Sequence, residues 1–476
     1  MQTFKIKFSC IMLLLFSEIS GQTGDLHWVN KTGARAFKQS ETIFRANDYG
    51  AVNDGKTLSS PFIQKAIDDC AAKGGGIVLL DPGTYVCGSI FLKDKVQFRI
   101  NKGVVILGSE NFKDYPEINT RIAGIEMKWP AALINLIDTR EASVTGEGTI
   151  NARGKFCWDK YWAMRKEYEA RNLRWIVDYD AKRVRTCLVQ NATDVRISGI
   201  TFKNAGFWTV QLLYSKFVTV EGVIIRNNED GHGPSTDGID IDSSSWILVE
   251  NCDIDCNDDN FCLKAGRDWD GLRVNRPTEY VVIRKCVARR GGGLLTLGSE
   301  TSGGIRHVWA DQLTASHTDN GLRIKSAVTR GGTMEDIYFQ NCTLDSVNVV
   351  FNYTLNWYPA YSYAELPKGY SYDSVPDYWK TILQKVVPAE KGIPHAKDLY
   401  VKNLQVTHAK TVFAAKGLET SPLAHFVYSQ SKITADKIGS MEYTKDWIFD
   451  GLQLNLDKEK KSMKAGSKEE NERMKN

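Results

Sequence analysis

The sequence predicts an all-β protein, a right-handed parallel β-helix (solenoid) with a short N-terminal helical cap. From about residue 195 onward, short apolar and β-branched segments recur with one internal pattern, apolar-x-polar-small-apolar. Equivalent positions lie mostly about 20–35 residues apart, which is the length of one coil per repeat. No helical periodicity separates these segments. They read VRISGITF, VTVEGVII, ILVENCDI, VVIRKCVA, IYFQNCTL, LYVKNLQV and WIFDGLQL.

The N-terminus has the pattern of a secretory signal peptide. Lys5 and Lys7 precede an apolar run over residues 10–16, and small and polar residues follow around Ser20 and Gly21. The apolar run is too short to span a bilayer. We therefore expect a signal peptide over residues 1–22, a secreted or periplasmic protein and no transmembrane segment.

One catalytic domain is expected over residues 40–456. Residues 64–70 form an amphipathic helical stretch ahead of the first strands, where a solenoid needs a cap over its open end. No proline-rich linker marks a second domain. Residues 457–476 are charged and nearly free of bulky apolar side chains, so we expect this tail to be disordered.

The cysteines are expected to be buried, free thiols. Alignment of the repeats places Cys252, Cys286 and Cys342 in one internal ladder, where a free cysteine acts as a small apolar side chain. Without the signal peptide the number of cysteines is odd and their spacing irregular, which argues against a disulfide framework. Cys252-x-x-x-Cys256 has no second Cys or His pair, so a zinc site is not expected.

Composition is that of an ordinary globular protein. Of 476 residues, 42% are hydrophobic and 25% charged, and the net charge of +4 is spread along the chain without a block of like charge. This argues against a nucleic-acid partner. We expect a monomer without cofactor or metal.

Three acidic residues are the candidate catalytic groups. Asp237 precedes Asp258 and Asp259 by about one coil, so stacking should bring the three carboxylates onto one face. Cleavage of a glycosidic bond needs one carboxylic acid and a second carboxylate, and clustered acids raise the pKa of one member. Acidic residues that cap turns are the alternative explanation.

A pair of cations follows downstream. Arg323 and Lys325 alternate on a predicted strand, which puts both side chains on one face. A guanidinium beside an ammonium suits a sugar that carries a carboxylate. Ordinary surface charge is the alternative.

These motifs resemble the polygalacturonase family, family 28 of the glycoside hydrolases, over residues 44–454. The family's NTD motif corresponds to Ser235-Thr236-Asp237, its paired aspartates to Asp258-Asp259, and its RIK motif to Arg323-Ile324-Lys325. The resemblance implies a parallel β-helix, a pectic polysaccharide or oligosaccharide as substrate, and hydrolysis with inversion. It implies that Asp258 is the general acid, that Asp237 and Asp259 activate water, and that the RIK cations hold the substrate carboxylate.

Two departures from the family pattern bear on specificity. Ser235 replaces the usual asparagine, and the GHG motif corresponds to Gly291-Gly292-Gly293, so the active-site histidine is replaced by Gly292. We expect a pocket altered for another pectic backbone, such as the alternating rhamnose and galacturonate of rhamnogalacturonan, or reduced activity. His232 and His317 are the nearest histidines that could compensate, although each could equally be a loop residue.

The segment over residues 267–276 resembles that of exo-acting relatives in length. Such a loop can block one end of a groove, and Arg267, Asp268 and Asp270 could contact the terminal sugar. An acidic turn is an equally ordinary explanation.

Two other functions remain open at this level. A calcium-dependent pectate lyase uses the same solenoid, with an arginine as base and carboxylates around the ion. A non-catalytic pectin-binding solenoid would account for the missing histidine.

Overall fold

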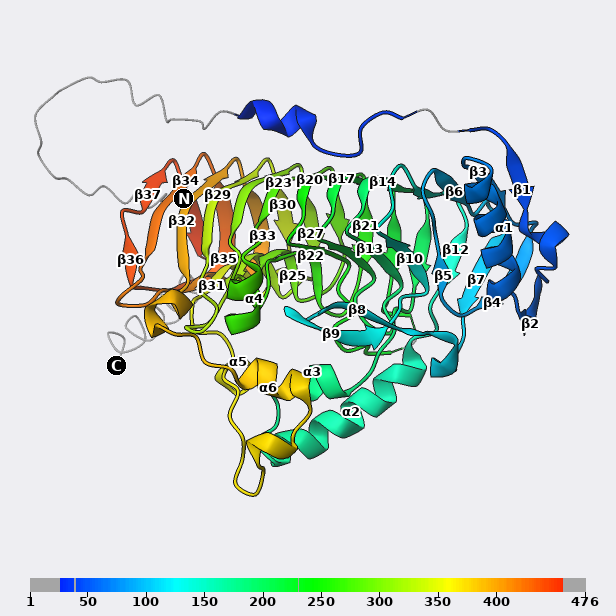
Figure 1. Cartoon of the computed structure of the whole chain (residues 1–476). Helices are drawn as coiled ribbons and strands as arrows, with labels where there is room; N and C mark the ends of the chain where they lie inside the picture. Colours follow the sequence, from blue (N-terminus) through cyan, green and yellow to red (C-terminus); the bar gives the residue numbers. More distant parts are fainter. Residues whose placement is uncertain (1–25, 38–39, 230, 457–476) are drawn as a thin grey trace, which may run out of the picture.

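The computed structural model describes residues 26–37, 40–229 and 231–456 and confirms the right-handed parallel β-helix (Figure 1). The coils stack into a 14-stranded and a 22-stranded sheet, both parallel. The larger sheet contains two ladders that merge at β33, so a typical coil contributes one strand to each of three ladders.

The 14-stranded sheet runs the length of the solenoid. Its strands are β1 (Ile43–Arg45), β3 (Gly76–Leu79), β6 (Val96–Arg99), β11 (Ser143–Thr145), β14 (Thr193–Ser198), β17 (Lys216–Glu221), β20 (Ser245–Glu250), β23 (Thr278–Arg284), β26 (Ile305–Asp311), β29 (Thr333–Gln340), β32 (His395–Lys402), β34 (Leu423–Ser429), β36 (Thr444–Lys445) and β37 (Ile448–Asp450).

The 22-stranded sheet consists of two ladders and the strands that they share. The first ladder is β5 (Ile90–Phe91), β10 (Ile134–Ile137), β13 (Cys187–Gln190), β16 (Val210–Leu213), β19 (Ile239–Asp242), β22 (Asp259–Lys264), β25 (Gly293–Leu297), β28 (Asn320–Lys325) and β31 (Val349–Thr354). The second is β2 (Asp54–Leu58), β4 (Gly83–Cys87), β7 (Val104–Gly108), β12 (Thr149–Asn151), β15 (Thr201–Lys203), β18 (Ile224–Arg226), β21 (Asp253–Asp255), β24 (Val287–Ala288), β27 (Thr314–Ser316) and β30 (Thr343–Asp345). Both continue into β33 (Gln405–Lys416), β35 (Lys432–Glu442) and β38 (Gln453–Leu456).

Like residues stack along the core, as the repeats predict. Cys252 and Cys286 occupy equivalent positions just before β21 and β24, and the backbone N–H of Cys252 lies 3.4 Å from Sγ of Cys286. Leu313 fills the next position and Cys342 the one after. All nine cysteines of the described residues are buried and free, which agrees with the predicted apolar ladder.

The predicted cap is present and longer than expected. Helix α1 (Ser60–Ala72) begins with Pro61 in its first turn, where the missing N–H costs no hydrogen bond. Ile63, Ile67 and Cys70 face the first coils and are fully buried. The helix therefore covers the N-terminal end of the apolar core.

Several elements outside the solenoid were not predicted. An antiparallel hairpin, β8 (Glu117–Ile122) and β9 (Ile125–Pro130), lies beside a helical group (Figure 1). The helices of this region are α2 (Lys155–Ala170), α3 (Val177–Asp180), α4 (Asp268–Val274), α5 (Pro359–Ser362) and α6 (Asp377–Leu383). Trp129 from the hairpin, Trp175, Phe207 and Trp379 share one buried apolar cluster. Short 3-10 helices complete the chain: η1 (Leu26–Lys31), η2 (Ala46–Tyr49), η3 (Phe112–Asp114), η4 (Tyr372–Ser374) and η5 (Ala389–Gly392).

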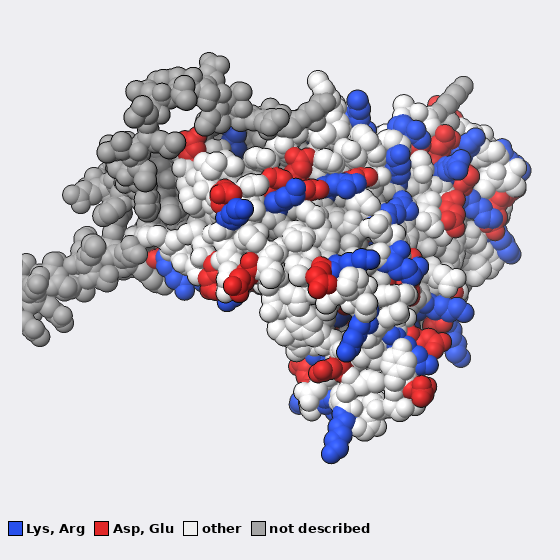
Figure 2. Space-filling model, turned by 60° about the vertical axis from the view of Figure 1, so that its left-hand side comes forward, with Lys and Arg blue, Asp and Glu red and all other residues white. Residues whose placement is uncertain are grey.

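Acidic and basic side chains are interspersed on the face shown in Figure 2. No helix in the described part of the chain is long and apolar enough to cross a bilayer. The expected signal peptide over residues 1–22 and the expected tail over residues 457–476 lie outside the described residues.

Candidate active site

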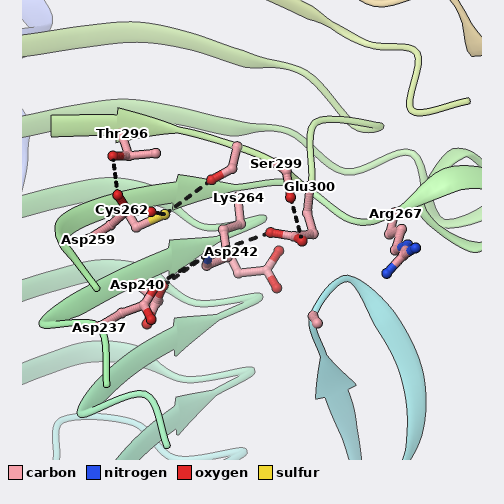
Figure 3. Close-up of polar contacts among 12 residues, drawn as sticks. Asp237, Asp240, Asp242, Asp259, Cys262, Lys264, Arg267, Thr296, Ser299 and Glu300 are labelled. Carbon is pink, nitrogen blue, oxygen red and sulfur yellow. Dashed lines mark hydrogen bonds and ion pairs between the residues drawn. The ribbon is translucent and has the colours of Figure 1, made fainter. Parts of the chain in front are cut away.

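The candidate site lies on the outer face of the ladder formed by β19, β22, β25 and β28. Alternation along β19 turns Ile239 and Ile241 into the core and Asp240 and Asp242 outward. Parallel register then aligns Asp240, Cys262, Thr296 and Arg323 across the four strands. Residues far apart in the sequence therefore form one polar surface, part of which Figure 3 shows.

The three predicted acids meet on this surface. Asp237 lies in the turn before β19, and Asp258 and Asp259 lie where β22 begins. One carboxylate oxygen from each lies within 4.8 Å of the others. Asp259 is fully buried and Asp237 is 3% exposed, whereas Asp258 is partly exposed. Of the three, Asp258 is the most accessible to an incoming ligand.

Asp259 is held in its ionised form. Its Oδ2 lies 2.7 Å from Nζ of Lys325, Oδ1 lies 3.4 Å from Nη1 of Arg323, and Thr296 donates its hydroxyl proton to Oδ1 at 2.7 Å. Burial alone would raise the pKa of Asp259, but Lys325, Arg323 and Lys264 outweigh burial and keep the pKa well below its usual range.

The other two acids are shifted towards their protonated forms. Burial, followed by the charge of Asp259, raises the pKa of Asp258. Burial, followed by the charges of Asp240 and Asp258, raises the pKa of Asp237 well above its usual value. The cluster thus pairs a carboxylate with a neighbouring carboxylic acid, which is the combination that glycoside hydrolysis needs.

The nearest oxygens of the three acids lie closer together than the carboxyl groups of a typical inverting pair. An inverting pair is usually about 6.5–9.5 Å apart, and a retaining pair about 5 Å. The nearest oxygens of Asp237, Asp258 and Asp259 fall within 4.8 Å. Inversion therefore stays a prediction of the family resemblance, and the configuration of the first product tests it.

Lys264 and Glu300 are polar site residues that sequence reasoning missed. Lys264, 4% exposed, lies at the end of β22, and its Nζ is 3.6 Å from Asp237, 3.3 Å from Asp240 and 3.5 Å from Glu300 (Figure 3). Burial raises the pKa of Asp240 to about 7, although Lys264 opposes the shift. For Asp240 and Lys264 the sequence did contain a signal. The alternation of inward and outward residues along β19 and β22 predicts that both side chains point outward.

Arg323 and Lys325 share one face of β28, as their spacing predicts. Their nearest anion is Asp259, and Trp357 covers them, with the ring centroid 5.8 Å from Cζ of Arg323 and 4.8 Å from Nζ of Lys325. Lys325 lines the cavity described below. In this arrangement the positive charges of Arg323 and Lys325 keep the carboxyl group of Asp259 ionised.

Gly292 lies directly over the acids. A Cβ atom at this position would lie 3.4 Å from Oδ1 of Asp258 and from Oδ1 of Asp259, an ordinary van der Waals distance. A side chain here would therefore cover the carboxyl group of Asp258, which is partly exposed in the structure. His232 is exposed, stacks on Trp162 and approaches Asn257, and His317 is an exposed turn residue.

The structure corrects the predicted contact of Arg267 and Asp268 with sugar. Arg267 is fully buried and donates to the Tyr179 hydroxyl at 2.8 Å and to the Tyr361 carbonyl at 2.7 Å. Asp268 is bound by Arg267, Thr329 and Arg330. Neither lines the cavity, and Figure 3 shows Arg267 apart from the acids, beyond Glu300. The polar groups of both side chains therefore bind neighbouring segments of the protein.

Asp270, the third residue considered in this loop, is also occupied by protein groups. It is 3% exposed, accepts a hydrogen bond from the backbone N–H of Glu126 at 2.8 Å, and pairs with Arg273 at 2.8 Å. Asp270 therefore ties α4 to the β8–β9 hairpin and does not reach a ligand.

A cavity of about 90 Å³ lies over the acids. Its lining combines carboxylates, cations and aromatic rings: Ala123, Arg174, Asp178, Phe207, Trp208, Ser235, Asp237, Asp258, Lys264, Ser299, Glu300, Lys325, Trp357 and Tyr361. Ala123 belongs to the turn of the β8–β9 hairpin, whose Gly124 carbonyl accepts a hydrogen bond from the N–H of Arg267 at 3.0 Å. The hairpin turn and the helical group therefore contribute to the wall of the cavity.

Two acidic groupings have the spacing of a metal site, Asp237 with Asp240 and Cys262, and Asp237 with Asp258 and Asp259. Lys264 lies 3.6 Å from Asp237, and Lys325 lies 2.7 Å from Asp259. These ammonium groups already neutralise the carboxylates that a cation would need. Calcium also needs about six to eight oxygen ligands, which this mixed donor set does not supply.

The chain is similar in sequence to proteins that are named for action on galacturonate polymers. A relative from Vitis vinifera, "Probable polygalacturonase", is 29% identical over 321 residues, covering 65% of this chain and 62% of that protein. The "Exo-poly-alpha-D-galacturonosidase" of Dickeya chrysanthemi is 27% identical, with 64% and 55% of the two chains covered. In both cases the match spans less than two thirds of the relative's length.

The crystal structure of a hyperthermoactive exopolygalacturonase from Thermotoga maritima has the same fold, with a TM-score of 0.73 at 23% identity over 90% of this chain and 95% of that one. The family model of Glycosyl hydrolases family 28 matches residues 85–352, which is more than half of the chain. The chain therefore belongs to family 28 of the glycosyl hydrolases.

Proposed function

We propose that the protein is a metal-independent glycoside hydrolase that removes sugars from one end of a galacturonate-containing pectic chain. The single observation that carries this proposal is the pairing of Asp258, in the cavity wall, with the buried Asp259 directly behind it. Asp258 is partly exposed with a raised pKa, and ionised Asp259 lies beside it. That pair supplies an acid and a base at one point.

The proposed reaction is a single displacement at the anomeric carbon. Asp258 gives its proton to the glycosidic oxygen, and the bond between that oxygen and the anomeric carbon breaks. A water molecule attacks the same carbon from the opposite face, and Asp259 takes the proton that water loses, while Asp237 orients the water. The product is then the inverted sugar and a shortened chain. The narrow spacing of the acids makes this stereochemical step the first to be tested.

The exo mode is supported by the hairpin and the helical group, which we propose close one end of the cavity. Ala123 at the hairpin turn lines the cavity. A hydrogen bond from the backbone N–H of Arg267 to the carbonyl of Gly124 holds the hairpin against the loop before α4. A polymer cannot extend past such a wall, so only a chain end can reach Asp258. Release of single sugars or of one repeat unit is the expected result.

Rhamnogalacturonan is a second candidate backbone. Gly292 leaves Asp258 partly exposed where a longer side chain would cover it. This opening gives room for a sugar of different shape next to the cleaved bond. The choice between the two backbones can be measured by digesting polygalacturonate and rhamnogalacturonan side by side and sizing the early products. A ladder of intermediate oligomers from polygalacturonate would contradict the exo mode.

A calcium-dependent lyase and a binding-only solenoid make different predictions. A lyase would stop in chelator and leave an unsaturated sugar at the new chain end. A binding-only solenoid would release no products. Retained release of saturated sugars in EDTA supports the hydrolase and excludes both alternatives.

A further inference from the structure

Arg174 lies in the wall of the active-site cavity, on the segment that joins α2 to α3. Nη1 donates to Oδ2 of Asp178 at 2.7 Å, and Oδ1 of Asp178 accepts from Arg183 at 2.8 Å. The rings of Tyr361 and Tyr358 lie 5.0 Å and 5.4 Å from Cζ of Arg174. These contacts fix the guanidinium in place. Arg174 is 9% exposed.

Part of this guanidinium is unused. Within the described residues, Nε of Arg174 is buried without a hydrogen-bond partner, and the bond to Asp178 is the one hydrogen bond that the guanidinium makes. Glu169 lies 3.7 Å from Nε, beyond hydrogen-bond distance, and is itself bound by Arg165 at 2.8 Å. Nε and Nη2 form one edge of the guanidinium, the edge that grips a carboxylate with two parallel hydrogen bonds.

The charge balance also favours an anion here. Three arginines, Arg165, Arg174 and Arg183, are paired with only two carboxylates, those of Glu169 and Asp178, which leaves one surplus positive charge. Lys264, in contrast, is surrounded by the three carboxyl groups of Asp237, Asp240 and Glu300. The surplus positive charge therefore lies at the helical wall of the cavity, and the carboxyl groups gather around Lys264 on the side of the strands. A ligand that carries its own carboxylate is best placed with that group against Arg174.

We infer that Arg174 is a second carboxylate-binding site of the cavity and recognises the uronate carboxylate of the terminal sugar. This site is separate from Arg323 and Lys325, whose charges are used on Asp259. The inference rests on the proposed function, because it assigns Arg174 to the sugar that enters the closed end. It explains how a neutral chain terminus would be rejected. Such a terminus would gain no charge-assisted hydrogen bond from this edge, so it would bind more weakly than a uronate.

The test compares two disaccharides that differ only in the terminal group. One is digalacturonate, and the other has galactose in place of the terminal galacturonate. Binding is measured by calorimetry in an Asp258→Asn background, with and without Arg174→Gln, and turnover is measured in the active protein. We expect Arg174→Gln to weaken digalacturonate binding by about 10- to 100-fold and to change binding of the neutral disaccharide by less than about threefold.

Arg171→Gln is the matched control, since Arg171 is an exposed residue at the end of α2 that pairs with Glu167. It should leave both affinities unchanged. Arg174→Lys keeps the positive charge but lacks the paired donors of the guanidinium. It should therefore weaken digalacturonate binding less than Arg174→Gln does, and still selectively. This variant replaces Arg174→Gln in the test if the glutamine variant is unstable. Equal losses for both ligands, or no loss for either, would overturn the inference. Selective loss of binding in a protein that cleaves neither disaccharide would overturn the proposed reaction and leave the carboxylate site standing.

Discussion

The ammonium group of Lys325 lies 2.7 Å from Oδ2 of Asp259, and both side chains are almost completely buried. This ion pair gives the acid cluster its asymmetry, because it keeps Asp259 ionised while burial shifts Asp258 towards its protonated form. Two adjacent aspartates in the sequence therefore have pKa values that are shifted in opposite directions.

The first prediction concerns the proton donor. Asp258→Asn removes the acid and keeps the size of the side chain, so turnover should fall by about 10²–10⁴-fold. The melting temperature should stay within a few degrees, because Asp258 is partly exposed. Steady-state kinetics with thermal unfolding checks both parts. Near-normal turnover in the folded variant would remove Asp258 from the mechanism.

The second prediction concerns the pH profile. Asp259 must be ionised, and its lowered pKa keeps the acid limb of the kcat/KM profile at low pH. Lys325→Met removes the largest of the charges that lower this pKa, so the pKa rises and the acid limb moves to higher pH. The variant also leaves a buried charge with one partner fewer, at a cost of up to about 3–5 kcal/mol of stability.

Lys325→Arg is the control for that shift, because it keeps the charge. The acid limb of the kcat/KM profile of Lys325→Arg should lie at nearly the same pH as that of the parent protein. An unchanged acid limb in a folded Lys325→Met protein would show that Lys325 does not set the charge of Asp259.

The third prediction concerns Gly292. A Cβ is accommodated here at 3.4 Å from both carboxyl groups, so Gly292→His should fold with a stability change of about 1 kcal/mol or less. The imidazole would fill the space over Asp258 and Asp259. The rate on rhamnogalacturonan oligosaccharides should then fall by about tenfold relative to the rate on polygalacturonate. Gly292→Ala, as a small control, should change the ratio little. A constant ratio in both variants would show that this opening does not select the backbone.

The fourth prediction concerns the wall at the closed end. Gly124 has φ +84°, and a Cβ there would lie 2.7 Å from the backbone nitrogen and 2.5 Å from Cβ of Arg267. Gly124→Ala should push the hairpin turn away from Arg267, lower stability by about 1–3 kcal/mol and increase the share of products longer than one repeat unit. Chromatography of early products from polygalacturonate checks this. If Gly124→Ala lowers the melting temperature but still releases only single sugars, the hairpin is not what blocks longer chains.

The solenoid and the acid cluster could be predicted because both follow from a repeat. One coil of spacing places Asp237 beside Asp258, and alternation places Arg323 and Lys325 on one face. The wall could not be predicted in the same way. The β8–β9 hairpin and α2–α3 lie outside the repeat, and their contacts with the sheet are tertiary. Arg267 shows the consequence, since a charged residue in a predicted loop proved to be buried beneath Tyr361.

The most direct test of the account is proton NMR of the first product released from an α-linked galacturonate oligomer in the presence of EDTA, recorded before mutarotation. The account predicts a saturated single sugar that appears first as the β-anomer, at a rate that EDTA does not change. An initial α-anomer, an unsaturated product or loss of activity in EDTA would contradict it.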